Sequence, residues 1–315
     1  MNIGIVKWAA NLGLALSLAL SPIGGQAVPM FSGSNGGGSA GFAGVIASLD
    51  TEPAPVPDWK TIPVIAHAMG SVDGRQETNS ADAFLASYEA GQRIFEVDLQ
   101  LTSDGVLVAR HDWNQDSYYH LEQPYVGVMD HETFMHTPIC YFYSPMDIDR
   151  ILALLISHPD AYLVTDSKNT DEATVRAQLR AMVQAVERSG SSGLWDRIIV
   201  QIYHQKMLDW VREETPVTNF IFTLYQIAKP DYEAIGAFCQ SNGIRVVTME
   251  ESRLNGKNSK ILHSYDCLVY IHTVNRLMEM VSATWGADGF YSDYITPDQF
   301  QAARDGNARP YLNAN

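Results

Sequence analysis

The sequence is poor in positive charge. Only 21 of its 315 residues are lysine or arginine, against 36 aspartate and glutamate residues, which gives a formal net charge of −15. There is no basic run and no patch of interleaved basic and aromatic residues, so nucleic acid is not an expected partner. Anionic lipid attracts clustered basic residues, and an acidic chain is therefore not expected to bind an anionic membrane surface.

Cysteines are also scarce, and the one notable apolar run is short. Cys140, Cys239 and Cys267 are far apart in the chain, which excludes a disulfide framework and favours small buried side chains. The charge-free run from Trp8 to Leu20 is too short to span a bilayer, so no stable membrane insertion is expected.

The first 58 residues are not expected to belong to the fold. Lys7 precedes the apolar run, and the small residues Gly25 and Ala27 offer a cleavage site before Val28, the pattern of a signal peptide. We therefore expect residues 1–27 to be a signal peptide and the protein to be secreted or periplasmic. Glycine, serine and proline dominate residues 28–58, which predicts a flexible linker. The folded domain is expected over residues 59–315.

The remaining residues alternate between short apolar runs and helical stretches. Several runs, such as IIVQI at 198–202, are apolar nearly throughout, as in strands buried on both faces. Eight such strands over about 240 residues predict a (β/α)8 TIM barrel. An open doubly wound sheet is the alternative, but no glycine-rich phosphate loop follows the first strand. The expected strands are 62–66, 94–98, 162–166, 198–202, 219–224, 244–248, 267–272 and 288–292, and the expected helices are 80–90, 147–157, 171–189, 204–213, 230–241 and 275–284.

Carboxylates mark the ends of two predicted strands. Glu96 and Asp98 are two residues apart, so they share one face of their strand. Two like charges this close repel unless a cation or a proton intervenes. Asp166 ends the next barrel strand. Three oxygen ligands without a thiolate suit a hard divalent cation, Mg²⁺ or Ca²⁺.

Two histidines and two further polar residues complete the candidate site. His67 ends the first strand, and His111 ends a short apolar run that follows the second. Histidine is the side chain best suited to acid–base catalysis near neutral pH. Lys168 either contacts a phosphate oxygen or simply pairs with Asp166. Gln201, at another strand end, is a candidate substrate contact. The set predicts a metal-assisted hydrolase site at the mouth of the barrel.

Seven short stretches carry these residues in order, each at a predicted strand end or turn. A single Glu-x-Asp is common on exposed strands, but the ordered set is far more specific than any member. The stretches are His67, Glu96-Val97-Asp98, Thr102-Ser103-Asp104-Gly105, His111-Asp112, Asp166-Ser167-Lys168, His272-Thr273-Val274-Asn275 and Gly286-Ala287-Asp288-Gly289-Phe290-Tyr291-Ser292-Asp293.

These stretches resemble the glycerophosphodiester phosphodiesterase family, in the superfamily of phosphatidylinositol-specific phospholipase C. The resemblance covers about residues 62–300. It implies a (β/α)8 barrel, a divalent ion held by Glu96, Asp98 and Asp166, and cleavage of a phosphodiester by His67 and His111. It also implies that the lysine after the third acid contacts phosphate. The expected partner is a small phosphodiester, which a lipid could supply.

The chain departs from the family pattern at three places. Ala68 stands where an arginine usually follows the first histidine, so one expected phosphate contact is missing, and Arg75 is a candidate substitute. Residues 76–80 replace the usual Pro-Glu-Asn-Thr stretch. The third acid is Asp166, where glutamate is commoner, and its Asp-x-Lys pattern also resembles sphingomyelinase D-type phospholipases.

Three functions are therefore considered. The first is hydrolysis of glycerophosphodiesters to glycerol phosphate and an alcohol. The second is a phospholipase C- or D-like activity on intact lipid headgroups, which requires an exposed apolar rim. The aromatic-rich residues 111–147, expected to cap the barrel mouth, could supply that rim. The third is a non-catalytic binding protein, which the missing arginine favours and the retained histidines and acids oppose.

Overall fold

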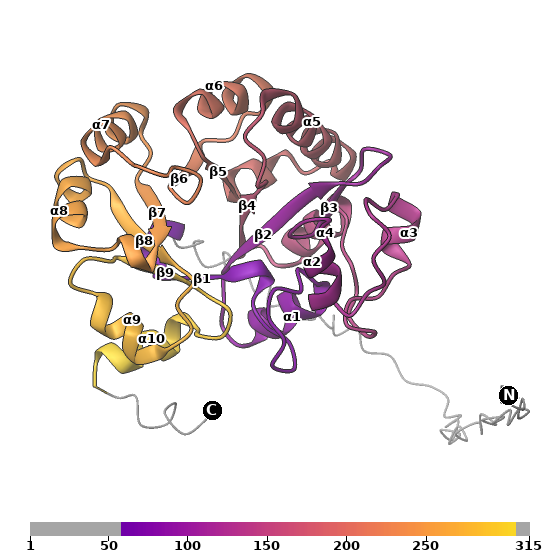
Figure 1. Ribbon diagram of the computed structural model, residues 1–315, viewed down its shortest axis with the longest axis horizontal. Helices are drawn as coiled ribbons and strands as arrows, with labels where there is room; N and C mark the ends of the chain where they lie inside the picture. The colour runs from indigo at the N-terminus through magenta and orange to yellow at the C-terminus, as the bar shows by residue number, and fades with distance from the viewer. Residues whose placement is uncertain (1–57, 307–315) are drawn as a thin grey trace, which may run out of the picture. The chain divides into compact units, whose positions relative to one another are not determined.

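Eight parallel strands close into a barrel in the computed structural model, which describes residues 58–306 (Figure 1). The strands follow the order β1-β9-β8-β7-β6-β5-β4-β2, and β1 pairs with β2 to close the ring. The predicted (β/α)8 barrel is thus confirmed. The barrel strands are β1 (Val64–Ala66), β2 (Ile94–Leu101), β4 (Tyr162–Asp166), β5 (Ile198–Ile202), β6 (Asn219–Thr223), β7 (Val246–Glu250), β8 (Leu268–His272) and β9 (Gly289–Ser292).

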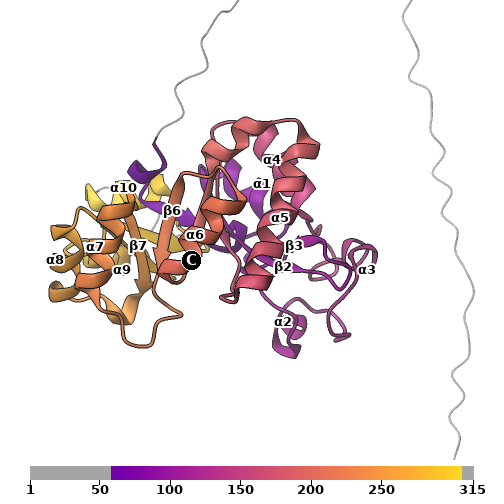
Figure 2. The same cartoon turned by 90° about the horizontal axis from the view of Figure 1, so that it is seen from above.

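Helices alternate with the strands and form the outer layer (Figures 1 and 2). All six predicted helices are present. Two helices of eight or nine residues, α8 and α10, were not predicted: α8 opens on the weak helix former glycine, and α10 opens with a capping box formed by Thr296 and Gln299. The helices are α1 (Ala81–Glu89), α2 (Gln115–His120), α3 (His131–Met135), α4 (Ile148–Ser157), α5 (Glu172–Ser189), α6 (Gln205–Glu214), α7 (Tyr232–Asn242), α8 (Gly256–Ser264), α9 (Leu277–Ala283) and α10 (Pro297–Arg304).

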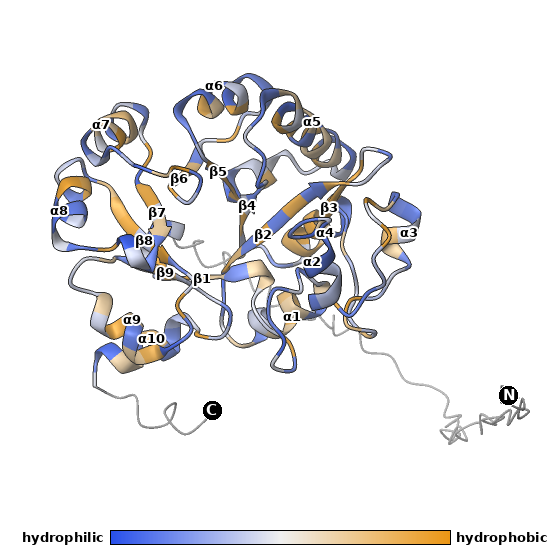
Figure 3. Ribbon diagram, viewed as in Figure 1, coloured by the Kyte–Doolittle hydropathy of each residue, from blue (hydrophilic) through white to orange (hydrophobic). Residues whose placement is uncertain are grey.

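Helix α4 illustrates how the chain builds this outer layer. The Asp147 side chain accepts from the Arg150 N–H and caps the helix start. Ile151, Leu152 and Leu155 recur at helical spacing and are buried. They belong to the large apolar cluster between strands and helices, and Figure 3 shows the same division between apolar inner faces and polar outer faces on the other helices.

A second apolar cluster fills the interior of the barrel. Side chains such as Ile65, Ile199 and Tyr270 point inward from neighbouring strands and are almost fully buried. Trp59 belongs to the same cluster, and its Nε1–H donates to Asn219 Oδ1 at 3.1 Å. Because the interior is packed, ligands are excluded from it and the strand ends are left to form the site.

The segment between His111 and Asp147 does not cap the barrel, contrary to expectation. It lies beside the hairpin of β2 and β3 (Leu107–Ala109), where Tyr118 and Phe134 pack into a small cluster of their own (Figure 2). Only His111 among its residues lines the barrel pocket. Tyr118 and Phe134 thus form a local core, whereas other aromatic residues of the segment, such as Tyr119 and Phe142, are exposed.

The other predictions for the chain as a whole concern its cysteines and its termini. All three cysteines are buried free thiols, as predicted. The predicted signal peptide, and the predicted linker apart from Asp58, lie outside the described residues, so both stay predictions. Among residues 58–306, no helix has the length and apolar character needed to cross a bilayer.

Candidate active site

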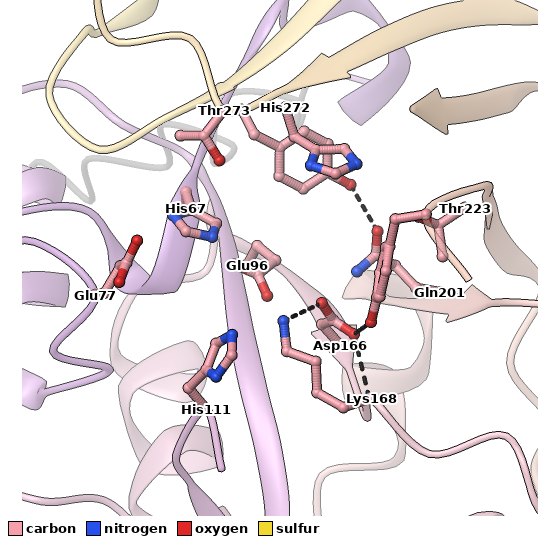
Figure 4. Close-up of a pocket in the computed structure, with 12 residues that line it drawn as sticks. His67, Glu77, Glu96, His111, Asp166, Lys168, Gln201, Thr223, His272 and Thr273 are labelled. Atoms are coloured by element: carbon pink, nitrogen blue, oxygen red, sulfur yellow. Dashed lines mark hydrogen bonds and ion pairs between the residues drawn. The ribbon is translucent and has the colours of Figure 1, made fainter. Parts of the chain in front are cut away.

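A pocket of about 320 Å³ lies at the carboxyl ends of the barrel strands (Figure 4). Parallel strands end at the same edge of a barrel, so polar residues at separate strand ends converge there. The lining residues are His67, Glu77, Glu96, His111, Asp166, Lys168, Gln201, Thr223, Tyr225, His272, Thr273 and Tyr291.

His67 directly follows β1, and a carboxylate that directly follows β9, the last barrel strand, orients its ring. Nδ1 of His67 lies 2.8 Å from Asp293 Oδ1. Asn275 holds that carboxylate, because its amide donates to Asp293 Oδ2 at 2.5 Å and its oxygen accepts from the Asp293 N–H at 2.9 Å. Burial lowers the pKa of His67, but the bond to Asp293 and the charge of Glu96 outweigh burial and raise this pKa to about 9.

Three buried carboxylates lie on β2 and β4. Parallel pairing places Asp98 opposite Asp166, and one oxygen from each of Glu96, Asp98 and Asp166 lies within 4.8 Å of the others. Glu96 Oε2 accepts from the Ala68 N–H at 2.7 Å, whereas Oε1 is buried without a hydrogen-bond partner. Burial, together with the charge of Asp98, raises the pKa of Glu96 to about 8.

Lys168 partly neutralises this cluster. Its Nζ lies 2.7 Å from Asp98 Oδ1 and 2.8 Å from Asp166 Oδ2. Burial lowers the pKa of Lys168, but the two carboxylates outweigh burial and raise it well above its usual range. The remaining Asp166 oxygen accepts from the hydroxyls of Tyr203 and Tyr225. Lys168 is the only positive side chain paired with these carboxylates in residues 58–306.

The acidic cluster suits a hard divalent cation. Its donors are all oxygens, and Glu96 Oε1 has no partner. One lysine faces three carboxylates, so a divalent cation would offset the excess negative charge that helps to keep the pKa of Glu96 raised. Glu96, Asp98 and Asp166 are therefore the residues that could hold the ion.

His111 lies on the more open side of the pocket. It follows β3, and its neighbour Arg110 donates its backbone N–H to the Asp98 carbonyl at 2.9 Å. The ring Nδ1 lies 2.7 Å from Asp112 Oδ2, and 47% of the His111 side chain is exposed. Figure 4 shows His111 and His67 on the same side of the pocket, with Glu96 and Lys168 beside them.

Most predicted site residues meet in this pocket. His67, Glu96, His111, Asp166, Lys168 and Gln201 line it, and Asp98 lies buried against Lys168. Arg75 does not line the pocket: its Nη1 donates to Glu122 Oε1 at 2.8 Å, so this arrangement does not make Arg75 a substitute for the missing arginine. A single arginine near a motif in sequence does not reveal where its side chain points.

Several supporting residues had no predicted role. Asn79 directly precedes Ser80, which caps α1, and the Asn79 amide donates to Asp98 Oδ2 at 2.8 Å. Asp293 and His272 belong to two of the stretches that carry the family resemblance, but the sequence predicts no role for either residue. The partner of Asp293 is 226 residues away in the chain, so only the closed barrel reveals their contact.

Comparison with known proteins identifies the family. The model of the glycerophosphoryl diester phosphodiesterase family matches residues 70–296, which include every residue of the site except His67. The chain belongs to this family. It is accordingly a phosphodiester hydrolase on a TIM barrel, as the motifs predicted.

Individual relatives are distant in sequence but similar in structure. A glycerophosphodiester phosphodiesterase of Bacillus subtilis is 22% identical over 246 residues, covering 70% of this chain and 81% of the relative. The Parabacteroides distasonis glycerophosphodiester phosphodiesterase has a TM-score of 0.62 and 17% identity, covering 79% of this chain and 98% of its own. An Oleispira antarctica phosphodiesterase, solved in complex with the product sn-glycerol-3-phosphate, has a TM-score of 0.61 and 16% identity, covering 77% and 96%.

Proposed function

We propose that this protein hydrolyses glycerophosphodiesters to glycerol phosphate and an alcohol, using a divalent cation and two histidines. One observation carries the proposal: a single pocket of about 320 Å³ holds His67, His111, two of the buried acids and Lys168. The product complex of the Oleispira antarctica relative supports the same substrate class. The retained histidines and acids favour an enzyme over a binding protein.

The acidic cluster would hold the ion, Mg²⁺ or Ca²⁺, through Glu96, Asp98 and Asp166. When bound, a divalent ion would withdraw charge from the phosphodiester and offset the negative charge of the carboxylates. Lys168 remains beside the cluster as a phosphate contact. Gln201, on the other side of the pocket, would bind the part of the substrate beyond the phosphate.

We assign the base role to His67 and the acid role to His111. A divalent ion bound beside Glu96 would lower the pKa of His67 from its ion-free value of about 9, so that the ring can be neutral and accept a proton. Asp293 holds Nδ1 of His67 and leaves Nε2 for the attacking hydroxyl or water, and the carboxylate would stabilise the imidazolium that forms. His111 lies on the more exposed side, where a released alcohol can leave, and Asp112 orients its ring. There it would donate a proton to the leaving oxygen.

Leaving-group chemistry tests these roles. A p-nitrophenyl leaving group needs little protonation, so His111→Ala should lose much less activity on p-nitrophenyl diesters than on glycerophosphocholine. His67→Ala should lose at least about 100-fold on both. The opposite pattern would exchange the two roles, and parental rates in both variants would remove the histidines from the mechanism.

Export is the second part of the proposal. It rests on Lys7, the apolar run from Trp8 to Leu20 and the small residues before Val28. We expect N-terminal sequencing of protein from the native host to start near Val28. A mature chain that starts at Met1 would contradict export through a cleaved signal peptide.

A further inference from the structure

One side of the pocket carries neutral polar groups that lack partners. Gln201 is the penultimate residue of β5, and Thr223 and His272 are the last residues of β6 and β8. We call these three residues the neutral wall. His272 Nε2 and Thr223 Oγ1 are buried without a hydrogen-bond partner. Buried polar atoms are usually paired, so unpaired ones that line a pocket point to a ligand.

His272 is the most informative member of the neutral wall. Its ring contacts Tyr225 and Tyr291 edge-on, with centroid separations of 6.0 Å in both cases. Burial lowers the pKa of His272 to about 4, so the ring is neutral at neutral pH. A neutral imidazole offers one N–H donor and one acceptor, which match a hydroxyl better than a charged phosphate.

The neutral wall is separated from the residues assigned to the chemistry. Figure 4 shows Gln201 and Thr223 on the opposite side of the pocket from His67 and His111, with His272 between the two sides. The Tyr291 hydroxyl donates to Gln201 Oε1 at 3.0 Å, which fixes the amide and directs its N–H groups elsewhere. The phosphate belongs with Lys168, so an uncharged part of the substrate is left for the neutral wall.

We propose that His272 determines specificity by hydrogen bonding a hydroxyl group on the uncharged arm of the substrate. This inference rests on the proposed glycerophosphodiesterase function and extends it to a named recognition residue. We assign that hydroxyl to the glycerol, the arm that every glycerophosphodiester shares, and a hydroxylated alcohol group is the alternative that the substrate comparison tests. Hydroxyl-bearing diesters are thus preferred over diesters of the same charge that carry none.

Substrate comparison in two variants tests this inference. His272→Phe keeps a ring but removes both nitrogens, whereas His272→Gln keeps a donor and an acceptor. One neutral hydrogen bond is worth up to about tenfold in binding. His272→Phe should therefore lower kcat/KM for glycerophosphocholine about tenfold, mainly through KM, and leave bis(p-nitrophenyl) phosphate, which has no free hydroxyl, within about twofold. His272→Gln should recover part of the loss.

Two further measurements locate the hydroxyl and supply a control. Glycerophosphocholine carries free hydroxyls only on glycerol, and inositol phosphate methyl ester carries them only on the alcohol, so the diester that loses more identifies the arm. His263→Phe is the matched control, because His263 pairs with Asp288 outside the pocket. This variant should leave kcat/KM unchanged for every substrate.

The outcomes separate the inference from the proposed function. Equal losses on all diesters in His272→Phe would indicate a merely structural role and overturn the inference, as would an unchanged KM. Calorimetry adds a binding readout: His272→Phe should weaken sn-glycerol-3-phosphate about tenfold but not inorganic phosphate. If the parent enzyme cleaves bis(p-nitrophenyl) phosphate but no glycerophosphodiester, the proposed function itself fails.

Discussion

The two sides of the barrel mouth are built from the same kind of strand but carry opposite chemistry. The charged side comes from β1, β2 and β4, and most of its groups pair with one another: Asp293 holds His67, and Lys168 bridges Asp98 and Asp166, while Glu96 Oε1 is left for an ion. The neutral wall, from β5, β6 and β8, keeps atoms without partners, including His272 Nε2. This difference suggests that one side performs the reaction and the other recognises the substrate.

Removing a histidine from the charged side should have the largest effect. Loss of a general acid or base costs about 10²–10⁴-fold in rate, so His67→Ala should lower kcat for glycerophosphodiesters at least about 100-fold. His272→Phe, on the neutral wall, should lower kcat much less. Steady-state kinetics of both variants make the comparison, and equal losses in kcat would erase the distinction between the two sides.

The acidic cluster should control ion affinity. Asp98→Asn removes one carboxylate charge beside Glu96 and Asp166, and we expect at least about tenfold weaker binding of Mg²⁺ or Ca²⁺ by calorimetry. Glu250→Gln is the matched control, because Glu250 also ends a barrel strand but pairs with Arg253. Equal ion affinity in Asp98→Asn and the parent would show that the ion does not bind at this cluster.

Stability of the ion-free protein should fall as pH rises above about 6.5, because below that pH the lowered pKa of His272 opposes the effect of Glu96. Folding raises the pKa of Glu96 from about 4.5 to about 8, so the folded state binds more protons than the unfolded state across that range. The favourable contribution of His67, whose pKa rises to about 9, is complete below about 6.5 and is lost as pH rises through about 9. Urea unfolding with chelator present should show the decline, and Glu96→Gln should flatten its lower part.

Added divalent ion supplies the control for this pH dependence. An ion bound at the cluster would replace the proton on Glu96, so the part of the decline that Glu96 contributes should weaken in its presence. Stability that is constant from pH 5 to 9 in the ion-free protein would contradict the electrostatic description of the charged side.

The smallest effect is expected from removing the hydrogen bond that supports Gln201 in the neutral wall. Tyr291→Phe removes the hydroxyl that donates to Gln201 Oε1 but leaves His67 and Lys168 in place. The loss of one neutral hydrogen bond in a supporting position should raise KM about threefold and leave kcat unchanged. A large fall in kcat would place Tyr291 on the catalytic side and weaken the comparison.

The fold and the reactive residues were predictable because their signals are local. Buried strands are apolar runs, and Glu96 and Asp98 are separated by one residue that fixes their common face. The supporting bonds were not predictable, because His67 meets Asp293 only after β1 pairs with β9 and the barrel closes. The predicted substrate contact at Arg75 was not supported for a related reason: its partner, Glu122, lies outside the motif that drew attention to it.

The predicted cap rested on the aromatic composition of residues 111–147, and that composition is compatible with two structures. Aromatic residues can cover a pocket or form a core, and Tyr118 and Phe134 are almost fully buried within their own segment. Sequence alone does not distinguish these outcomes, because both require the same apolar side chains. The recognition role proposed for His272 was also invisible in sequence, since it depends on which of its atoms the fold leaves without partners.

Phosphorus NMR of glycerophosphocholine hydrolysis tests the central claim most directly. With Mg²⁺ or Ca²⁺, the parent enzyme should convert the diester signal into that of glycerol phosphate, and chelator or His67→Ala should each abolish at least about 99% of the rate. Formation of glycerol phosphate at the parental rate in chelator, or in His67→Ala, would contradict the assignment of the reaction to the charged side of the pocket.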